Sequence, residues 1–217
     1  MSTVRQSLLI GLLSAAAFAQ SGKLGVFTDS GDVGSPAIKG STQFDTSNGQ
    51  YRIAGSGANI WGKLDQFQYA WREIAGNFTA SATLRFLGEG AEHRKAGIMV
   101  RQSLDADATY ADVMIHGNGQ AALQWRSRKG EDTNTFDLPV AGPGTFNIKF
   151  VRNGVKMYMY VGKDGAEAKE IAHTEVSLQG PVLVGLAVCA HDPEKSETAV
   201  FSNVSVEVQA PPAPKPQ

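Results

Sequence analysis

The sequence predicts an all-β protein, a β-sandwich built from antiparallel strands. Three observations predict this fold class: apolar and polar residues alternate through the body of the chain, turn-forming Gly and Asn residues separate the alternating runs, and no stretch has helical periodicity. A strand with one buried face and one solvated face produces such alternation, and short hairpins make neighbouring strands antiparallel. About a dozen short strands favour a sandwich over alternating α/β layers.

Residues 1–19 are predicted to be a secretory signal peptide. They carry a single charge, Arg5, followed by an apolar run and by Ala17-Phe18-Ala19, which fits the small-x-small rule for cleavage. The apolar run is too short to anchor the chain in a bilayer, and no later segment is long and apolar enough to span one. We therefore expect cleavage after Ala19 and a secreted or periplasmic protein without a membrane span.

The chain ends in a proline-rich tail, residues 209–217, which holds four of the nine prolines. Proline lacks the backbone donor that helices and sheets need, so we expect an extended, solvated segment, either a spacer or a bare end. The remaining residues, 20–208, are expected to form one sandwich domain.

Six alternating runs each predict a strand with one buried and one solvated face. They cover 66–72, 78–86, 111–116, 120–126, 146–150 and 155–159. The segment 182–190 is apolar on both faces and predicts a central strand, in which Cys189 should be buried. The Asn118-Gly119 and Asn153-Gly154 pairs predict primed hairpin turns, because both residue types accept positive φ.

Charge and cysteine content exclude several partners and cofactors. The 20 Lys and Arg residues are balanced by 21 Asp and Glu, so the chain is not expected to bind nucleic acid. A single cysteine excludes an internal disulfide framework and a Cys-rich zinc site. The four histidines are dispersed along the chain and do not predict a zinc site, and the sequence has no phosphate-binding loop. We therefore expect no metal and no cofactor.

Several sequence blocks, spread over residues 59–204, occur in an order that resembles the concanavalin A-like lectin/glucanase sandwich superfamily. Within that superfamily, the sequence resembles bacterial secreted domains of unknown function that accompany carbohydrate-active and propeller proteins. It implies a jelly-roll of two curved sheets and supplies no substrate, because members of this fold serve many roles. The blocks are Asn59-Ile60-Trp61-Gly62, 65–69, 95–101, Gly117-Asn118-Gly119, Gln124-Trp125-Arg126, 184–188, His191 and Phe201-Ser202-Asn203-Val204.

Glycoside hydrolysis requires two carboxylates about 5–5.5 Å apart for retention or about 6.5–9.5 Å apart for inversion. Glucanases of the superfamily place them on one strand as Glu-x-Asp-x-Glu, and no predicted strand here carries that pattern. Two acidic i, i+2 pairs, Asp105/Asp107 and Asp192/Glu194, lie outside clear strands. We therefore expect a protein that is not an enzyme.

Two groups of aspartates could offer carboxylates to calcium, Asp29 with Asp32 and Asp105 with Asp107. Neither has the ligand count or spacing of a recognised calcium loop, and aspartates that cap turns are the favoured interpretation. Calcium binding stays open at this point.

Polar residues on several strands have the parity opposite to the expected core, and they are the candidate binding surface. If those strands are neighbours, their polar side chains share one face, which on sandwiches of this superfamily often holds sugars; an ordinary solvated sheet face is the alternative. Trp71 and Trp125 share parity with apolar residues and are expected in the core, whereas Trp61 is available to stack on a sugar ring. The candidate ligand-binding residues are Trp61, Gln68, Arg72, Arg101, Asp112, His116, Gln124 and Arg126.

The sequence therefore favours an exported, non-catalytic β-sandwich that binds a glycan, a polysaccharide or a related extracellular polymer. The alternative is a structural or protein-interaction module with a protein partner in the cell envelope. A glycoside hydrolase is the least favoured of the three, because the paired carboxylates are missing.

Overall fold

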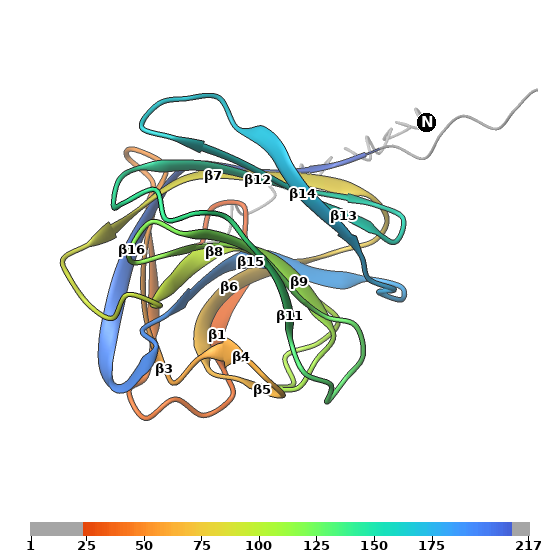
Figure 1. The fold of residues 1–217 in the computed structure, drawn as a ribbon, viewed down its shortest axis with the longest axis horizontal. Coiled ribbons are helices and arrows are strands. Elements are labelled where there is room, and N and C mark those ends of the chain that lie inside the picture. Colours follow the sequence, from red (N-terminus) through yellow and green to blue (C-terminus); the bar gives the residue numbers. More distant parts are fainter. Residues whose placement is uncertain (1–23, 210–217) are drawn as a thin grey trace, which may run out of the picture.

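The computed structural model describes residues 24–209, which form sixteen strands and no helix (Figure 1). Fourteen of the strands make two seven-stranded antiparallel sheets, which confirms the predicted all-β jelly-roll sandwich. The predicted signal peptide, residues 1–19, and residues 210–217 of the predicted tail lie outside the described range. Within that range, no helix is long and apolar enough to cross a membrane.

One sheet, called the front sheet here, arches over a short two-stranded hairpin in Figure 1. The hairpin consists of β4 (Ile60–Trp61) and β5 (Leu64–Asp65). In spatial order the front sheet contains β1 (Asp29–Val33), β6 (Phe67–Ile74), β15 (Val182–Cys189), β8 (Lys95–Arg101), β9 (Tyr110–His116), β10 (Ala121–Arg126) and β11 (Asn134–Asp137).

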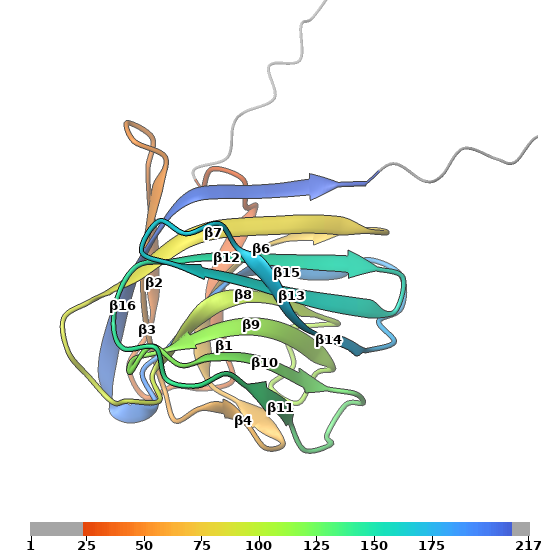
Figure 2. The ribbon, with the colours of Figure 1, turned by 45° about the horizontal axis from the view of Figure 1, so that its top comes forward.

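The back sheet lies against the other face of the front sheet (Figure 2). Its longest strand, β16, pairs with both β7 and β3, so the end of the chain closes the middle of this sheet. In spatial order the back sheet contains β14 (Lys169–Glu175), β13 (Lys156–Lys163), β12 (Phe146–Asn153), β7 (Phe78–Leu87), β16 (Asp192–Val208), β3 (Gln50–Gly57) and β2 (Ser41–Asp45).

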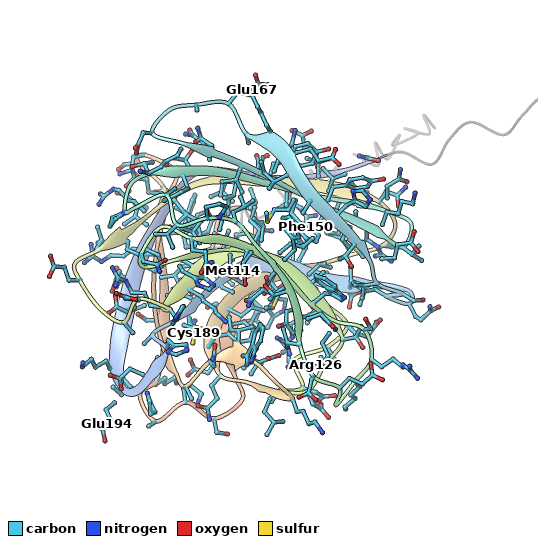
Figure 3. The ribbon with its side chains drawn as sticks, viewed as in Figure 1. Met114, Arg126, Phe150, Glu167, Cys189 and Glu194 are labelled. Atoms are coloured by element: carbon cyan, nitrogen blue, oxygen red, sulfur yellow. The ribbon has the colours of Figure 1, made fainter. Side chains whose placement is uncertain are left out.

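The main hydrophobic core fills the space between the two sheets. In the back sheet it follows the alternation of the sequence: every second residue of β7 from Phe78 to Leu84 is buried, and the residues between them are more exposed. Phe150 on β12 lies in this core and stacks on Phe78, with 6.4 Å between ring centroids (Figure 3).

The front sheet is buried on both of its faces in the centre. Every residue of β8 and of β9 is buried, and β15 lies between β6 and β8, which confirms the predicted central strand. A second hydrophobic cluster covers the face turned away from the main core, and the buried thiol of Cys189 belongs to it. Cys189 is therefore buried as predicted, in this second cluster.

The two Asn-Gly pairs form different turns. Gly154 has φ +63° at the first central position of the β12–β13 hairpin and is followed by Val155 without positive φ, which fits a primed, type II′ turn as predicted. The primed turn predicted at Asn118-Gly119 is wrong. Only Gly119 has positive φ there, at +83°, and its amide donates to the His116 carbonyl, which is typical of a type I turn followed by a glycine bulge.

Candidate functional site

The face of the front sheet that is turned away from the main core carries an unusual number of charged and polar side chains. Strand register places them there, because Asp112 lies opposite Met99 on one side and opposite Gln124 on the other. Residues directly opposite each other project to the same face. The polar and charged residues brought together on this face are Lys95, Arg101, Asp112, His116, Gln124 and Arg126.

Half of this face is closed by a buried ion-pair network. Arg126 donates to both carboxylate oxygens of Asp65, at 2.9 and 2.8 Å, and Arg101 lies 3.5 Å from the same carboxylate. The guanidinium groups also lie over aromatic rings, Arg126 over Tyr110 and Arg101 over Phe67 at about 5 Å. All three charged side chains are fully buried. The network therefore fastens the β4–β5 hairpin onto the sheet.

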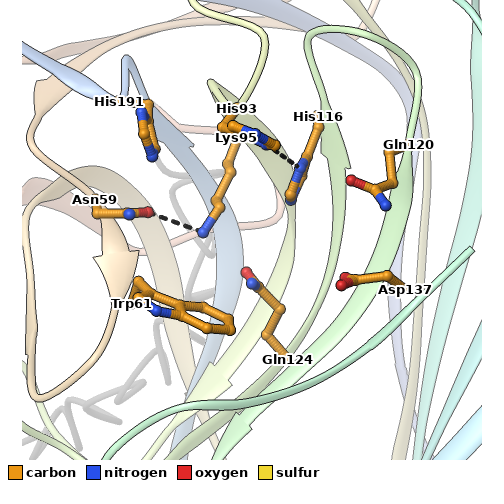
Figure 4. A pocket seen from close by; sticks show the side chains of 9 residues that line it. All are labelled: Asn59, Trp61, His93, Lys95, His116, Gln120, Gln124, Asp137 and His191. Carbon is orange, nitrogen blue, oxygen red and sulfur yellow. Dashed lines mark hydrogen bonds between the residues drawn. The ribbon is translucent and has the colours of Figure 1, made fainter. Parts of the chain in front are cut away.

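The other half of the face is open and forms a pocket of about 240 Å³ (Figure 4). One wall is Trp61 on β4, whose side chain is substantially exposed at 41%. The opposite wall comes from β10 and β11, and three histidines close one end. The lining residues are Asn59, Trp61, His93, Lys95, His116, Gln120, Gln124, Asp137 and His191.

Lys95 occupies the centre of the pocket floor in Figure 4. Its Nζ donates to Asn59 Oδ1 at 2.9 Å and to the Ile60 carbonyl at 2.8 Å, and it lies 5.5 Å from the centroid of the Trp61 ring. Burial lowers the pKa of Lys95, while the charge of Asp112 opposes that shift. Lys95 thus links the hairpin to the sheet and turns its ammonium toward the pocket.

Three imidazoles meet at one end of the pocket, although they are far apart in the sequence. His93 Nδ1 lies 3.4 Å from His116 Nδ1, and the ring centroids of His93 and His191 are 5.6 Å apart. Burial, with Lys95 as the next cause, lowers the pKa of His116 to about 3. Burial also lowers the pKa of His191. His116 is therefore a neutral imidazole at physiological pH.

Two buried polar atoms in the pocket have no hydrogen-bond partner among the described residues. They are Gln124 Oε1 and His116 Nε2, on side chains that are only 2% and 6% exposed. Buried polar atoms are nearly always hydrogen-bonded, and each exception needs a reason. Both atoms belong to residues that line the pocket, so a polar ligand could complete their hydrogen bonding.

The structure places the eight candidate residues in three different environments. Trp61, His116 and Gln124 line the pocket. Asp112, Arg101 and Arg126 are on the same face but fully buried beneath it, which suits positioning better than direct contact; their ligand-binding role stays a prediction. The remaining two are Gln68 and Arg72.

The expectation that Gln68 and Arg72 share this face is wrong. They pair with Val188 and Val184, which face the main core between the sheets, and Gln68 donates to Thr42 Oγ1 of the back sheet. The prediction assumed that the apolar residues of β6 face the main core. Because β6 is covered on both faces, its aromatic residues lie instead on the pocket-bearing face, in the second cluster.

The tryptophans divide in the same way. Trp125 packs against the main core, as predicted, whereas Trp71 packs against the second cluster on the pocket-bearing face, stacked on Tyr69 with 5.5 Å between centroids. Trp71 was predicted to lie in the main core, and this prediction is wrong, because Trp71 lies on the opposite face of the front sheet.

Six pocket residues were not predicted from the sequence, and Lys95 is the most important of them. Lys95 pairs with His116 across β8 and β9, so identifying it requires the strand register. His93 lies two residues before Lys95, and this i, i+2 spacing was the available signal. The six are Asn59, His93, Lys95, Gln120, Asp137 and His191.

The two aspartate groups considered for calcium have other partners. Asp105 and Asp107 both pair with Lys129, at 2.6 and 3.5 Å. Asp29 accepts from the Ser30 amide and Asp32 from the Gly40 amide, as turn-capping aspartates do. Within residues 24–209, no group of three or more His, Cys, Asp or Glu side chains is placed to hold a metal ion.

Two packed antiparallel sheets, with an arched front sheet that bears a pocket, define a jelly-roll β-sandwich. Comparison with solved structures confirms this fold. A functionally unknown protein from Saccharomyces cerevisiae matches with a TM-score of 0.61 and 19% identity, over 79% of this chain and 93% of that one. The carbohydrate binding module CBM66 from Bacillus subtilis matches with a TM-score of 0.54 and 17% identity, over 84% and 97%.

Similar structures also include a mutant of the GH43 protein BlXynB from Bacillus licheniformis. Its TM-score is 0.56 at 16% identity, over 83% of this chain but only 39% of that one. Lectins are also among the matching chains. No family model and no curated protein sequence matches the chain. At these identities the likeness shows the fold, and any function has to be argued from the pocket.

Proposed function

We propose that this protein binds carbohydrate in the pocket formed by Trp61, Lys95 and their neighbours, without catalysing a reaction on it. The observation that supports this most is the exposed Trp61 indole standing beside a ring of hydrogen-bonding side chains. Sugars present hydroxyl groups at the ring edge and apolar C–H groups on the ring face. An aromatic wall with polar groups around it is complementary to both.

The size of the pocket suits a small unit. At about 240 Å³ it lies below the range of roughly 300–1,000 Å³ for drug-sized ligands. It is open on one side, so one sugar residue could enter while the rest of a longer glycan stays outside. A carbohydrate binding module and lectins share the fold, which agrees with this proposal.

The absence of catalysis is inferred from the acids of the pocket. Among the described lining residues Asp137 is the sole carboxylate, whereas glycoside hydrolysis uses two that flank the scissile bond. Asp65 on β5 and Asp112 on β9 are fully buried, and Asp65 is paired with Arg126. Hydrolysis of a glycan by the purified protein would overturn this part of the proposal.

We also propose that the protein acts outside the cytoplasm, since residues 1–19 have the pattern of a secretory signal. The measurement is the mass of the protein recovered from the periplasm or medium of a bacterial host. A chain that begins at Gln20 would support export, and retention of the full sequence in the cytoplasm would contradict it.

Binding is tested with a glycan array and with pull-downs on insoluble polysaccharides. The wild-type protein should bind at least one glycan, and Trp61→Ala should weaken that binding about tenfold or more through loss of the stacking surface. Phe136→Ala is the matched control, because Phe136 is also an exposed aromatic at 47% but lies opposite Leu123, whose side chain faces the main core. No binding to any glycan, or equal loss in both variants, would contradict the proposal.

A further inference from the structure

The pocket that we propose as the sugar site has one Lys or Arg among its described lining residues, Lys95, and this cation indicates a ligand class. Lys95, Arg101 and Arg126 are buried on this face of the front sheet, against two buried carboxylates, Asp65 and Asp112. Asp65 is taken up by the arginines, since it accepts two hydrogen bonds from Arg126 and lies 3.5 Å from Arg101. Among these five buried side chains one positive charge is left in excess even if Asp112 is ionised, and the carboxylate of Asp137 in the pocket wall is exposed.

Lys95 is the cation that reaches the pocket. Among the described residues no Asp or Glu oxygen lies within ion-pair distance of its Nζ. The two acceptors that it has, Asn59 Oδ1 and the Ile60 carbonyl, are neutral, and an ammonium has three N–H donors. A buried charge is costly without an opposite charge beside it. The third donor of Lys95 is therefore suited to an anion.

The neighbouring groups favour a saccharide that carries the anion. Gln124 Oε1 is an acceptor without a partner among the described residues, and its side chain lies beside Lys95 in Figure 4. It would accept from a hydroxyl group, which a free inorganic anion such as chloride lacks. His116 Nε2 is likewise without a partner. Trp61 closes the opposite side with an apolar ring face.

Taking these contacts together, we infer that the pocket binds an acidic saccharide, with the carboxylate of a uronic acid at Lys95 Nζ, a ring hydroxyl at Gln124 Oε1 and the ring face on Trp61. This inference rests on the proposed function and narrows it to a substrate class. One charge in the pocket opposes it: the exposed carboxylate of Asp137 on β11, across the pocket from Lys95. The Asp137 carboxylate should repel an acidic saccharide, so replacing it with a neutral side chain should raise the affinity of the pocket for such a ligand.

The experiment compares pairs of oligosaccharides that differ only in charge. The probes are oligogalacturonates against their methyl esters, and glucuronate-bearing oligosaccharides against carboxyl-reduced counterparts, titrated calorimetrically into the full protein. For at least one pair the acidic member should bind about tenfold or more tightly than the neutral one. That difference should shrink as sodium chloride is raised, because salt screens a charge interaction and leaves stacking intact.

Two variants locate the effect. Lys95→Met should bring the acidic and neutral members to equal affinity, and Asp137→Asn should tighten the acidic member alone. Because Asp137 is exposed, its variant should fold even if Lys95→Met does not. Equal binding of both members by the wild type, or a difference that neither variant changes, would overturn the inference while leaving sugar binding in place. Failure to bind any acidic or neutral glycan would overturn the proposed function as well.

Discussion

Arg126 on β10 and Asp65 on β5 are joined by two parallel hydrogen bonds, Nη1 to Oδ2 at 2.9 Å and Nη2 to Oδ1 at 2.8 Å, with both side chains fully buried. Strand β5 and the adjoining β4 are only two residues long each, too short to hold their place by pairing alone. The pair therefore fixes the hairpin that carries Trp61, and with it one wall of the pocket.

Removing the Asp65 charge should destabilise the protein strongly. Asp65→Asn leaves Arg126 and Arg101 buried without a countercharge, which costs about 3–5 kcal/mol of unfolding free energy. Urea denaturation measures this loss. Glu131→Gln is the control, because Glu131 pairs with the exposed Arg128 and its loss should cost less than about 1 kcal/mol. Similar losses in the two variants would show that the buried pair does not hold the hairpin.

His116 should make the protein less stable in mild acid. Its pKa falls to about 3 in the folded state from an ordinary 6.5, so below pH 6.5 the unfolded chain binds a proton that the folded chain does not. Stability is therefore complete above that pH and decreases as the pH falls, by about 1–2 kcal/mol at pH 5.

Urea unfolding at pH 5 and pH 7.5 tests this prediction in the wild type and in His116→Gln. Lys95, His93 and His191 face the same imidazole and are retained in both proteins, so the difference between the two pH dependences isolates His116. The variant should lose less stability between pH 7.5 and pH 5 than the wild type does. An identical loss in both proteins would contradict the assignment.

Gly185 on β15 should not tolerate a side chain. It has no positive φ, but a Cβ there would overlap the carbonyl oxygen of Ala70 on the neighbouring strand. Gly185→Ala should therefore cost about 1–3 kcal/mol in thermal or urea unfolding. Gly31→Ala is the matched control on β1, where the added methyl would meet only the Trp71 ring at an ordinary 3.7 Å. Wild-type stability of Gly185→Ala would show that the strands separate without cost.

Cys189 should be chemically inert in the folded protein. Its side chain is buried, and that burial raises the thiol pKa to about 11, so almost no thiolate exists at pH 8. A thiol reagent such as Ellman's reagent should label it only after urea is added. Rapid labelling of the native protein at pH 8 would contradict the buried position.

Much of the fold could be predicted from the sequence, because the alternation of apolar and polar residues indicates which face of a strand is buried and which is exposed to solvent. Strand β7 is the clearest case, with Phe78, Ala82 and Leu84 facing the core as predicted. Alternation fails where both faces are buried. On β6 the aromatic face and the face of Ala70 are both covered, so parity alone could not show that Gln68 points between the sheets.

The pocket was only partly predictable for a different reason. Trp61 was predicted because an available aromatic ring suits a sugar site, and His116 and Gln124 were predicted because their parity is opposite to that of the core residues. Lys95 joins them through the pairing of β8 with β9, and His191 joins them from the connection between β15 and β16. These contacts depend on sheet order and register, which single-strand patterns do not contain.

The position of a bound glycan tests the central claim most directly. The protein has three tryptophans, and their indole N–H signals in a proton–nitrogen NMR spectrum report on three places: the pocket for Trp61, the second cluster for Trp71 and the main core for Trp125. Titration with a glycan that binds should shift the Trp61 signal, identified by its loss in Trp61→Phe, and should leave the Trp125 signal in place. Binding that leaves the Trp61 signal unmoved would contradict the account.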